Sequence, residues 1–372
     1  MSRNQIRIAG SMRLAQFVAA FIGALLLTAC ASGPEQKQGP VFYPPLPNSP
    51  RIQHLHSITA LKDIGAGSAF AEFVLGKEAN EGLVNKPYGI ATQKGKIYVV
   101  DTRGPGYVVL DLKAKKHTLV SGDGQGRMRK PINMTIDHDG NKYITDTGRN
   151  QVLVFNQRDR FVRAYGIEGQ FKPGDVVIVG DKLYISDLKH HLIQVLDKKS
   201  GKLLFKLAKK SKNEKSIKKE DPSALYFPTN MAVYDKNLYI SDTGYFKIVK
   251  YTLDGKFISS RGEVGTSLGD FARPKGIAFD KQGRLYVVDA AFENVQVFDD
   301  KGKLLLFFGG PGSYPDNINL PTDVLVDYKN VEYFQKYAAP GFKLEYIIIV
   351  ASQFGVNKLN VFGFGKMAGM DY

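Results

Sequence analysis

One phrase recurs along this chain at intervals of 42 to 55 residues. Each copy begins with a Pro in a short polar segment, continues through an apolar run, and ends in a Tyr-containing box closed by Asp. The copies begin at Pro87, Pro131, Pro173, Pro228 and Pro274, with a degenerate sixth copy at Pro321. A repeat of this length that consists of short apolar runs predicts a ring or array of similar units.

Within each copy the apolar residues alternate or run in short groups, without the spacing of a helix. The fifth copy has four such runs, at residues 276–279, 285–288, 295–298 and 304–309, separated by turns of Asp, Gly and Lys. Each copy is therefore predicted to be a four-stranded sheet. Such a sheet cannot bury both faces alone, so it needs a neighbour on either side. We predict an all-β fold, a six-bladed β-propeller.

The sixth copy lacks an apolar run for its fourth strand. Residues 52–76 precede the first Pro, and within them residues 70–76 resemble the fourth strand of the fifth copy, which ends in Phe308-Gly309. We therefore expect the N-terminal segment to complete the sixth blade and close the ring. Closure of this kind removes the exposed sheet edges that promote aggregation.

Two features of the copies resemble the NHL-repeat family: the Pro-x-Gly-hydrophobic-Ala opening at Pro87 and Pro274, and the Tyr-containing box that ends in Asp-Thr-Gly at Asp146 and Asp242. The resemblance covers roughly residues 85–310 well and the sixth copy poorly. It implies six blades, in agreement with the repeat count. The chain contains no Trp, so the signature of WD40 propellers is absent.

The N-terminus has the features of a secretory leader. Arg3, Arg7 and Arg13 precede an apolar run at residues 14–27, which is too short for a comfortable membrane span. The run ends in Leu-Thr-Ala-Cys30, which resembles a bacterial lipobox. This resemblance implies cleavage before Cys30 and acylation of that residue, and Ala31 after it favours the outer membrane. With more than one acyl chain, at ~0.8 kcal/mol per buried CH₂, such an anchor is stable.

We therefore divide the chain into a leader at residues 1–29, a lipidated tether at 30–51 and the propeller at 52–372. The tether is predicted to be extended because it contains Pro34, Pro40, Pro44, Pro45, Pro47 and Pro50. Cys30 is the only cysteine, so none remains for a disulfide, a thiolate nucleophile or covalent haem attachment. No motif in the sequence requires a cofactor.

The chain carries a formal net charge of +15, which favours acidic partners such as anionic lipid, acidic polysaccharide or an acidic protein. Some NHL propellers bind RNA through a basic face, but the lipobox predicts a cell-envelope location and no nucleic acid. The densest basic segment is an insertion between the third and fourth copies, which is either a solvated loop or a docking loop for an acidic surface. It contains Lys206, Lys209, Lys210, Lys212, Lys215, Lys218 and Lys219.

The aspartates that close the five boxes stand directly before tight turns. They are Asp101, Asp146, Asp187, Asp242 and Asp289. A carboxylate in this position accepts backbone N–H groups and fixes the turn. Because the residue recurs in every full copy, we interpret it as structural rather than catalytic.

Residues that break the symmetry of the repeat are better candidates for a site. Asn133, Asp175, Asn230 and Asp323 lie two positions after the Pro of their copies, where Gly89 and Gly276 stand in the other two. Propeller geometry places these positions near the central axis. Their oxygens could hold Ca²⁺, as in the propeller lactonases and gluconolactonases, although the sequence shows no catalytic base beside them.

Two histidine pairs also break the repeat. His190 and His191 are adjacent, so a strand would point them to opposite faces. His54 and His56 would share a face and could begin a metal site, but no third ligand is evident. We interpret both pairs as ordinary histidines.

The sixth copy contains residues with helical spacing at Val331, Phe334 and Tyr337, before Pro340-Gly341. They predict one or two helical turns. Such a helix would either fill the seam of the ring or bind a partner.

Together these features predict a lipid-anchored envelope protein whose propeller binds a protein or another acidic partner without catalysis. The alternative is a propeller hydrolase or lyase with a divalent metal in the axial channel. A third hypothesis is that the propeller escorts a secreted or redox partner such as a cytochrome.

Overall fold

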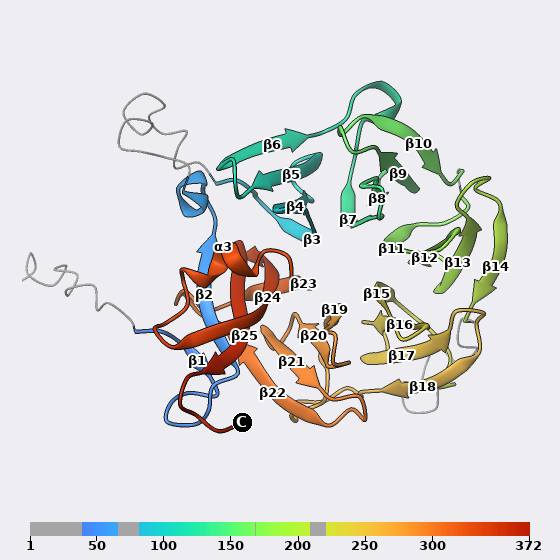
Figure 1. Ribbon diagram of the computed structural model, residues 1–372. Helices are drawn as coiled ribbons and strands as arrows, with labels where there is room; N and C mark the ends of the chain where they lie inside the picture. The colour runs from blue at the N-terminus through green and yellow to red at the C-terminus, as the bar shows by residue number, and fades with distance from the viewer. Residues whose placement is uncertain (1–38, 66–81, 168, 209–220) are drawn as a thin grey trace, which may run out of the picture. The chain divides into compact units, whose positions relative to one another are not determined.

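The computed structural model describes residues 39–65, 82–167, 169–208 and 221–372. Residues Pro40–Tyr372 form one compact unit. Six antiparallel sheets surround a central axis in this unit, which confirms the predicted all-β, six-bladed propeller (Figure 1).

Blades I to V follow the chain, each from an innermost strand to an outermost strand. Blade I contains β3 (Pro87–Gln93), β4 (Lys96–Asp101), β5 (Gly106–Asp111) and β6 (Lys116–Val120). Blade II contains β7 (Pro131–Ile136), β8 (Lys142–Asp146), β9 (Gln151–Phe155) and β10 (Phe161–Tyr165). Blade III contains β11 (Pro173–Val179), β12 (Lys182–Asp187), β13 (Leu192–Asp197) and β14 (Leu203–Leu207). Blade IV contains β15 (Pro228–Tyr234), β16 (Asn237–Asp242), β17 (Lys247–Thr252) and β18 (Phe257–Arg261). Blade V contains β19 (Pro274–Phe279), β20 (Leu285–Asp289), β21 (Asn294–Phe298) and β22 (Leu304–Gly309).

Blade VI combines the two ends of the propeller. Its strands are β23 (Asn319–Asp327), β24 (Phe342–Phe354), β25 (Leu359–Met367), β2 (Ile52–Ile58) and β1 (Phe42–Tyr43). The expected closure by the N-terminal segment is therefore confirmed, with β2 as the fourth strand. Residues 70–76, which resemble a fourth strand in sequence, lie outside the described residues.

Strand β1 lies within the segment that the sequence assigned to a tether. Phe42 pairs with Gln53 in the sheet, and the Tyr43 hydroxyl donates to the Asp316 carboxylate at 2.5 Å. The compact unit begins at Pro40, so the boundary of the propeller moves about a dozen residues toward the N-terminus.

Apolar side chains from the middle strands fill the space between neighbouring blades. Between blades I and II, for example, Tyr98, Val100, Met134 and Ile144 are all buried in one cluster. The closing strand is held in the same way, since Ile52 is fully buried against Phe362 and Phe308 of the last two blades. Burial of this surface is the main stabilising contribution to ring closure.

The predicted helical turn is present as α3 (Val331–Gln335). Its Phe334 is fully buried in the cluster between blades VI and I, and the Tyr333 hydroxyl donates to the carbonyl of Ile64. The apolar side of α3 is therefore used within the chain, as expected of a helix that fills the seam.

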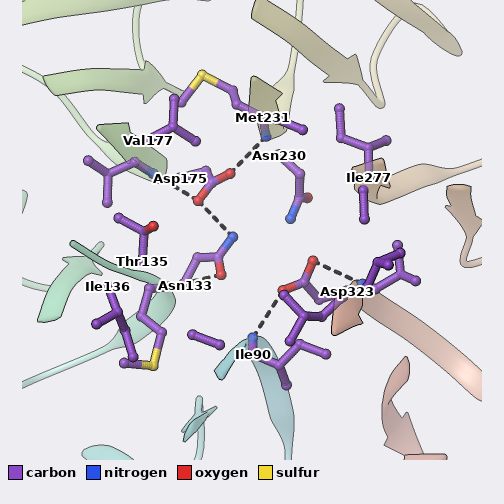
Figure 2. A pocket seen from close by; sticks show the side chains of 18 of the residues that line it. Ile90, Asn133, Thr135, Ile136, Asp175, Val177, Asn230, Met231, Ile277 and Asp323 are labelled. Carbon is purple, nitrogen blue, oxygen red and sulfur yellow. Dashed lines mark hydrogen bonds between the residues drawn. The ribbon is translucent and has the colours of Figure 1, made fainter. Parts of the chain in front are cut away.

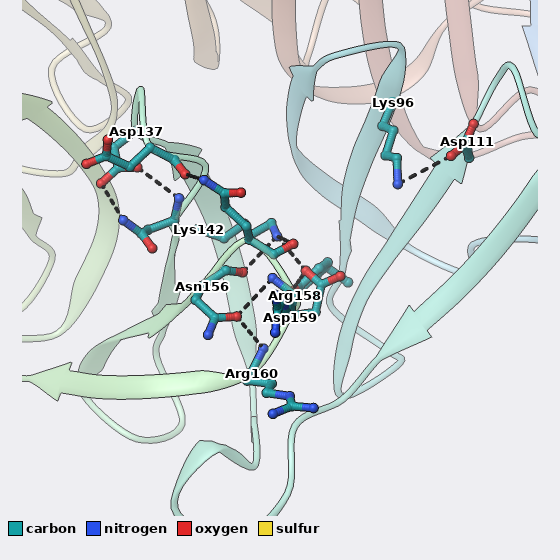
Figure 3. Close-up of polar contacts among 12 residues, drawn as sticks. Lys96, Asp111, Asp137, Lys142, Asn156, Arg158, Asp159 and Arg160 are labelled. Atoms are coloured by element: carbon teal, nitrogen blue, oxygen red, sulfur yellow. Dashed lines mark hydrogen bonds and ion pairs between the residues drawn. The ribbon is translucent and has the colours of Figure 1, made fainter.

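A polar cluster in blade II includes Lys142 and Asp159 (Figure 3). The ammonium group of Lys142, which is 1% exposed, lies 2.7 Å from the Asp159 carboxylate and donates to the carbonyls of Asn156 and Gln157. The Tyr107 hydroxyl of blade I donates to the same Asp159 at 2.8 Å. This cluster ties blade I to blade II because one carboxylate serves groups from both.

Candidate functional site

The propeller has two faces, which differ in their loops. One face is formed by the connections between blades and by the loop between the second and third strands of each blade. We name it the connector face. The innermost strands begin at this face and run along the axis. The candidate sites are therefore the axial channel and the connector face around its mouth.

The four symmetry-breaking residues do converge on the axis, from β7, β11, β15 and β23 (Figure 2). Asn133, Asp175, Asn230 and Asp323 line a cavity of about 320 Å³, and we call them the axial ring. Each is at least nine-tenths buried. The geometry expected from the repeat thus places these residues together.

Hydrogen bonds within the axial ring connect successive blades. The Asn133 amide donates to Asp175 Oδ1 at 2.8 Å, and the N–H of Met231 donates to Asp175 Oδ2 at 2.7 Å. The N–H of Val176 also donates to Asp175 Oδ1. One carboxylate therefore joins blades II, III and IV.

Asp323 performs a similar role where the ring closes. Its Oδ2 accepts the N–H of Ile90 in blade I at 3.0 Å, and its Oδ1 accepts the N–H of Val324. Glycine is needed at the two remaining positions, because a Cβ on Gly276 would lie 2.4 Å from the Cα of Asp323. A Cβ on Gly89 would similarly lie 1.9 Å from Asn133 Oδ1.

The electrostatics of the axial ring disfavour negative charge. Burial raises the pKa of Asp175 to about 7, although the N–H groups of Met231 and Val176 lower it. Burial also raises the pKa of Asp323 well above its ordinary value, and the charge of Asp175 adds to this effect. Desolvation is the main cause in both cases.

One buried oxygen of the axial ring has no hydrogen-bond partner among the described residues. Asn230 Oδ1 is buried and accepts no hydrogen bond. Two carboxylates and two amides are oxygen donors of the type that Ca²⁺ binds, so the residue types fit such an ion. Among the described residues no group of three or more His, Cys, Asp or Glu side chains is arranged to hold a metal, and every Asp oxygen of the ring already accepts an N–H.

A cation and a tyrosine from different blades meet near the axis. Lys275 Nζ of blade V donates to the Tyr88 hydroxyl of blade I at 3.3 Å. Both residues directly follow the Pro that begins an innermost strand, so the pair lies toward the connector face.

The box aspartates lie at the ends of the second strands and accept backbone N–H groups on both sides of a turn. Asp146 accepts from Arg129, Lys130, Gly148 and Arg149. The pattern recurs in the other blades at Asp101, Asp187, Asp242 and Asp289. These carboxylates fix the connections to the turns, which is a structural role.

The expectation that His54 and His56 share a face is wrong. A bulge between them pairs His54 with Phe362 and His56 with Val361, and consecutive partners point to opposite faces. His54 contacts the Phe362 ring, whereas His56 stacks on Tyr337. Burial lowers the pKa of His54 to about 4. The two rings therefore cannot begin a metal site together.

The other histidine pair is also separated. His190 Nδ1 lies 2.6 Å from the Asp187 carboxylate, and His191 stacks on Tyr226 with ring centroids 5.0 Å apart. Of the Lys-rich insertion, only Lys206 is described, and it is exposed on β14. Lys209, Lys210, Lys212, Lys215, Lys218 and Lys219 lie outside the described residues, as does Cys30.

The connector face is divided into two halves by charge. The loops and connections of blades I to III carry Lys86, Arg103, Arg127, Arg129, Lys130, Arg149, Lys172 and Lys189. Asp63 and Asp123 are the acidic residues among their described positions. The loops and connections of blades IV to VI carry the acidic residues Asp221, Glu263, Asp270, Glu293 and Asp316 and the basic residues Arg273 and Lys358. We name the part of the face on blades I to III the basic half. The part on blades IV to VI is named the apolar half, for the exposed side chains described next.

The apolar half has its name from exposed large side chains. They are Tyr226, Phe227, Val264, Leu268, Tyr314, Phe354 and Val356. Ile167, in the connection between blades II and III, is a similar residue outside this half. The halves meet where His191 stacks on Tyr226 and where Lys86 lies over the Phe354 ring at 4.9 Å.

Sequence reasoning did not single out this arrangement. The arginines at 103, 127, 129 and 149 belong to separate loops, and the Lys-rich insertion is a more conspicuous basic segment. The available signal was the recurrence of a basic residue two or three positions after the box Asp, at Arg103, Arg149 and Lys189. Equivalent loop positions in consecutive blades lie side by side.

No helix in the described ranges is long and apolar enough to span a membrane. No family model matches the chain. The fold is similar to that of a Bacteroides thetaiotaomicron protein of unknown function, with a TM-score of 0.56 and 19% identity over 76% of this chain and 70% of that one. It is also similar to a gluconolactonase of Xanthomonas campestris, with a TM-score of 0.55 and 14% identity over 88% and 96% of the two chains. At such identities the likeness shows the propeller fold alone.

Two curated proteins are related in sequence. The chain is 27% identical over 148 residues to the protein Brain tumor of Drosophila melanogaster, over 38% of this chain and 13% of that protein. It is 28% identical over 184 residues to NHL repeat-containing protein 3 of Mus musculus, over 44% and 50%. The chain thus spans half or less of the length of these relatives. The six blades and these relatives fit an NHL-repeat β-propeller, which confirms the predicted resemblance.

Proposed function

We propose that this chain is a lipid-anchored envelope protein whose propeller is a non-catalytic binding module for a protein partner. The observation that carries the proposal is the apolar half of the connector face. Large exposed apolar and aromatic side chains gathered on one face are typical of protein interfaces. NHL-type propellers as a class are protein-interaction modules, which agrees with this use of the face.

The side chains of the apolar half come from several loops held by buried anchors. Tyr226 and Phe227 directly precede β15, and their N–H groups donate to the Asp242 carboxylate. Their backbone is therefore fixed while their rings are 41% and 39% exposed. Fixed aromatic side chains lose little conformational entropy on binding, so they suit the centre of an interface.

The axial ring supports the non-catalytic part of the proposal. A catalytic carboxylate needs oxygens directed at a substrate, but those of Asp175 and Asp323 each accept backbone N–H groups. Their hydrogen bonds join blades II to IV and blades VI and I. These contacts account for the ring as a structural tie.

Anchoring in the envelope is proposed from the lipobox resemblance at Cys30 and from the leader before it. The test is metabolic labelling with palmitate of cells that express the native chain or the Cys30→Ala variant. We expect the label on the native protein and none on the variant, because Cys30 is the residue to be acylated. Equal labelling of both would contradict the lipid anchor.

The binding role is tested by affinity purification of the native chain from gently solubilised membranes. The variant Tyr226→Ala/Phe227→Ala should reduce recovery of a specific partner by about tenfold or more, since buried aromatic residues dominate interfaces. The control is Leu203→Ala/Leu204→Ala, which removes a similarly exposed apolar pair from β14, at 45% and 46% exposure. Recovery that is unchanged in the first variant, or equally reduced in the control, would contradict the proposal.

A second candidate function is a metal-dependent propeller hydrolase or lyase. The convergence of the axial ring and the unpartnered Asn230 Oδ1 favour it. In that case Asn230, Asp175 and Asp323 would supply oxygen ligands to a divalent ion. Calorimetric titration of the purified chain with CaCl₂ tests this function: tight binding that is lost in Asn230→Ala would support it, and a flat titration would remove it.

A further inference from the structure

A groove on the basic half lies between blades I and II, and it has the features of a binding site. Pro105, Gly124, Arg127, Met128, Arg129 and residues 148–151 line a hollow of about 960 Å³. The lining comes from three loops: the one after β4, the connection from β6 to β7, and the one after β8. Three arginines therefore line the same space, two from the connection between blades I and II and one from a loop of blade II.

The arginine on blade II is fixed by the connection that precedes it. Arg149 Nη1 donates to the carbonyls of Gln125 and Arg127 at 2.7 and 2.9 Å, and its Nε donates to Gln151 Oε1. The connection can approach this turn because residue 148 is glycine, where a Cβ would lie 3.0 Å from the Cβ atoms of Arg129 and Lys130. The walls of the groove are thus held in place by backbone contacts.

The side chains of Arg127 and Arg129 are exposed, and no ion pair or hydrogen bond within the described ranges involves their guanidinium groups. Two other cations of blades I and II are paired within the chain. Lys142 is paired with Asp159, and Lys96 lies 3.3 Å from Asp111. Two guanidinium groups without partners beside a third that is fixed are suited to carboxylates, which Arg binds in a bidentate manner.

A second hollow continues from the first around the same connection. It has a volume of about 760 Å³, shares Gly124 with the arginine groove, and is lined by Leu119, Phe161 and Arg160 among others. Leu119 is 56% exposed. An apolar side chain next to acidic residues in a bound segment could therefore contact Leu119 and Phe161.

We propose that this groove binds an extended acidic peptide segment of the partner protein, with carboxylates at Arg127, Arg129 and Arg149 and an apolar residue toward Leu119. The inference rests on the proposed function and adds the chemistry of the bound segment. Single-stranded nucleic acid is less suited, because base recognition uses aromatic stacking and no aromatic residue lines the arginine groove. Asp123 lines the neighbouring hollow, where its charge opposes an acidic ligand.

The test uses the purified full chain and a fluorescein-labelled peptide of six glutamates followed by leucine, measured by fluorescence anisotropy at low salt. Arg127→Glu/Arg129→Glu should weaken binding by at least about tenfold. Lys113→Glu/Lys116→Glu makes the same change of charge at two exposed positions, in the β5–β6 turn and at the start of β6, and should leave affinity within about twofold. Asp123→Asn should strengthen binding by about twofold, since it removes a repulsive charge.

An equal loss of peptide affinity in both double variants would show that the peptide responds only to net charge. That result would overturn the groove as the binding site. Tighter binding of a single-stranded RNA of similar charge, or of phosphatidylglycerol vesicles, would overturn the peptide assignment. Thermal unfolding of each variant shows whether it is folded. If the peptide fails to bind while partner recovery still depends on Tyr226 and Phe227, the groove is wrong and the proposed function stands. If the peptide binds in the groove but no partner depends on the apolar half, the proposed function fails instead.

Discussion

The axial ring and the arginine groove both gather polar side chains from neighbouring blades, but they use them in opposite ways. In the axial ring the oxygens of Asp175 and Asp323 accept N–H groups of the chain itself. In the groove, the guanidinium groups of Arg127 and Arg129 have no such partners among the described residues. Convergence alone therefore does not identify a binding site. Groups that converge and remain available for an external partner are the better indication.

The largest expected effect comes from a charge that is used within the chain. Asp159→Ala removes the partner of buried Lys142 (Figure 3) and should lower the free energy of unfolding by about 3 kcal/mol, because a buried charge is left unpaired. Urea unfolding measures this difference. The control is Asp111→Ala, whose partner Lys96 is 41% exposed, and it should lose less than about 1 kcal/mol. Equal losses would contradict the distinction between the two pairs.

The next effect tests whether the axial ring is a structural tie. Asp175→Ala leaves the N–H groups of Met231 and Val176 without an acceptor, and we expect a loss of about 2–3 kcal/mol. Asn230→Ala is the matched variant, since its Oδ1 accepts no hydrogen bond, and it should lose about 1 kcal/mol or less. A larger loss in Asn230→Ala would reverse our interpretation of the ring.

The pH dependence of stability also tests whether the axial ring stabilises the fold. The folded pKa of Asp175 is raised from 3.8 to about 7, so the folded state binds this proton more tightly than the unfolded state. Its stabilising contribution is complete below about pH 4 and is lost as the pH rises through about 7. Between these values the native protein should lose at least about 1 kcal/mol relative to Asp175→Asn. Parallel stability curves for the two proteins would contradict the raised pKa.

The smallest effect on stability is expected in the groove. Arg127→Glu/Arg129→Glu should leave the free energy of unfolding within about 0.5 kcal/mol, because exposed side chains without partners contribute little to the fold. Thermal denaturation of the same protein used for peptide binding measures this. A destabilised variant would show that these arginines make contacts that stabilise the fold, as the carboxylates of the axial ring do.

The sequence predicts the architecture because the physical requirement is repeated in every blade. In blades I to V a Pro begins each innermost strand and an Asp fixes each turn, so the period reveals the blades. The convergence of Asn133, Asp175, Asn230 and Asp323 follows from the same symmetry, because equivalent positions meet at the axis. Their mutual hydrogen bonds could not be predicted, since these depend on side-chain rotamers and on the room left by Gly89 and Gly276.

Features outside the repeat were harder to predict. The closing strand Ile52–Ile58 has no box or turn that marks it, and the bulge that separates His54 from His56 arises from pairing with β25. Neither the bounds of this strand nor the position of the bulge can be predicted from the local sequence. The arginine groove was missed for a similar reason, since its residues come from loops whose contact depends on how adjacent blades sit together.

The composite sixth blade also has a consequence for how the chain is made. Strand β2 is synthesised before any complete blade, yet its partner β25 follows about three hundred residues later. Until translation reaches that strand, the ring stays open, with unpaired edges on β2 and β24. A product truncated before Leu359 therefore lacks more than one strand, because β2 loses the neighbour that holds it. Quality control by proteases would recognise such products by their open seam, even though five blades are already complete.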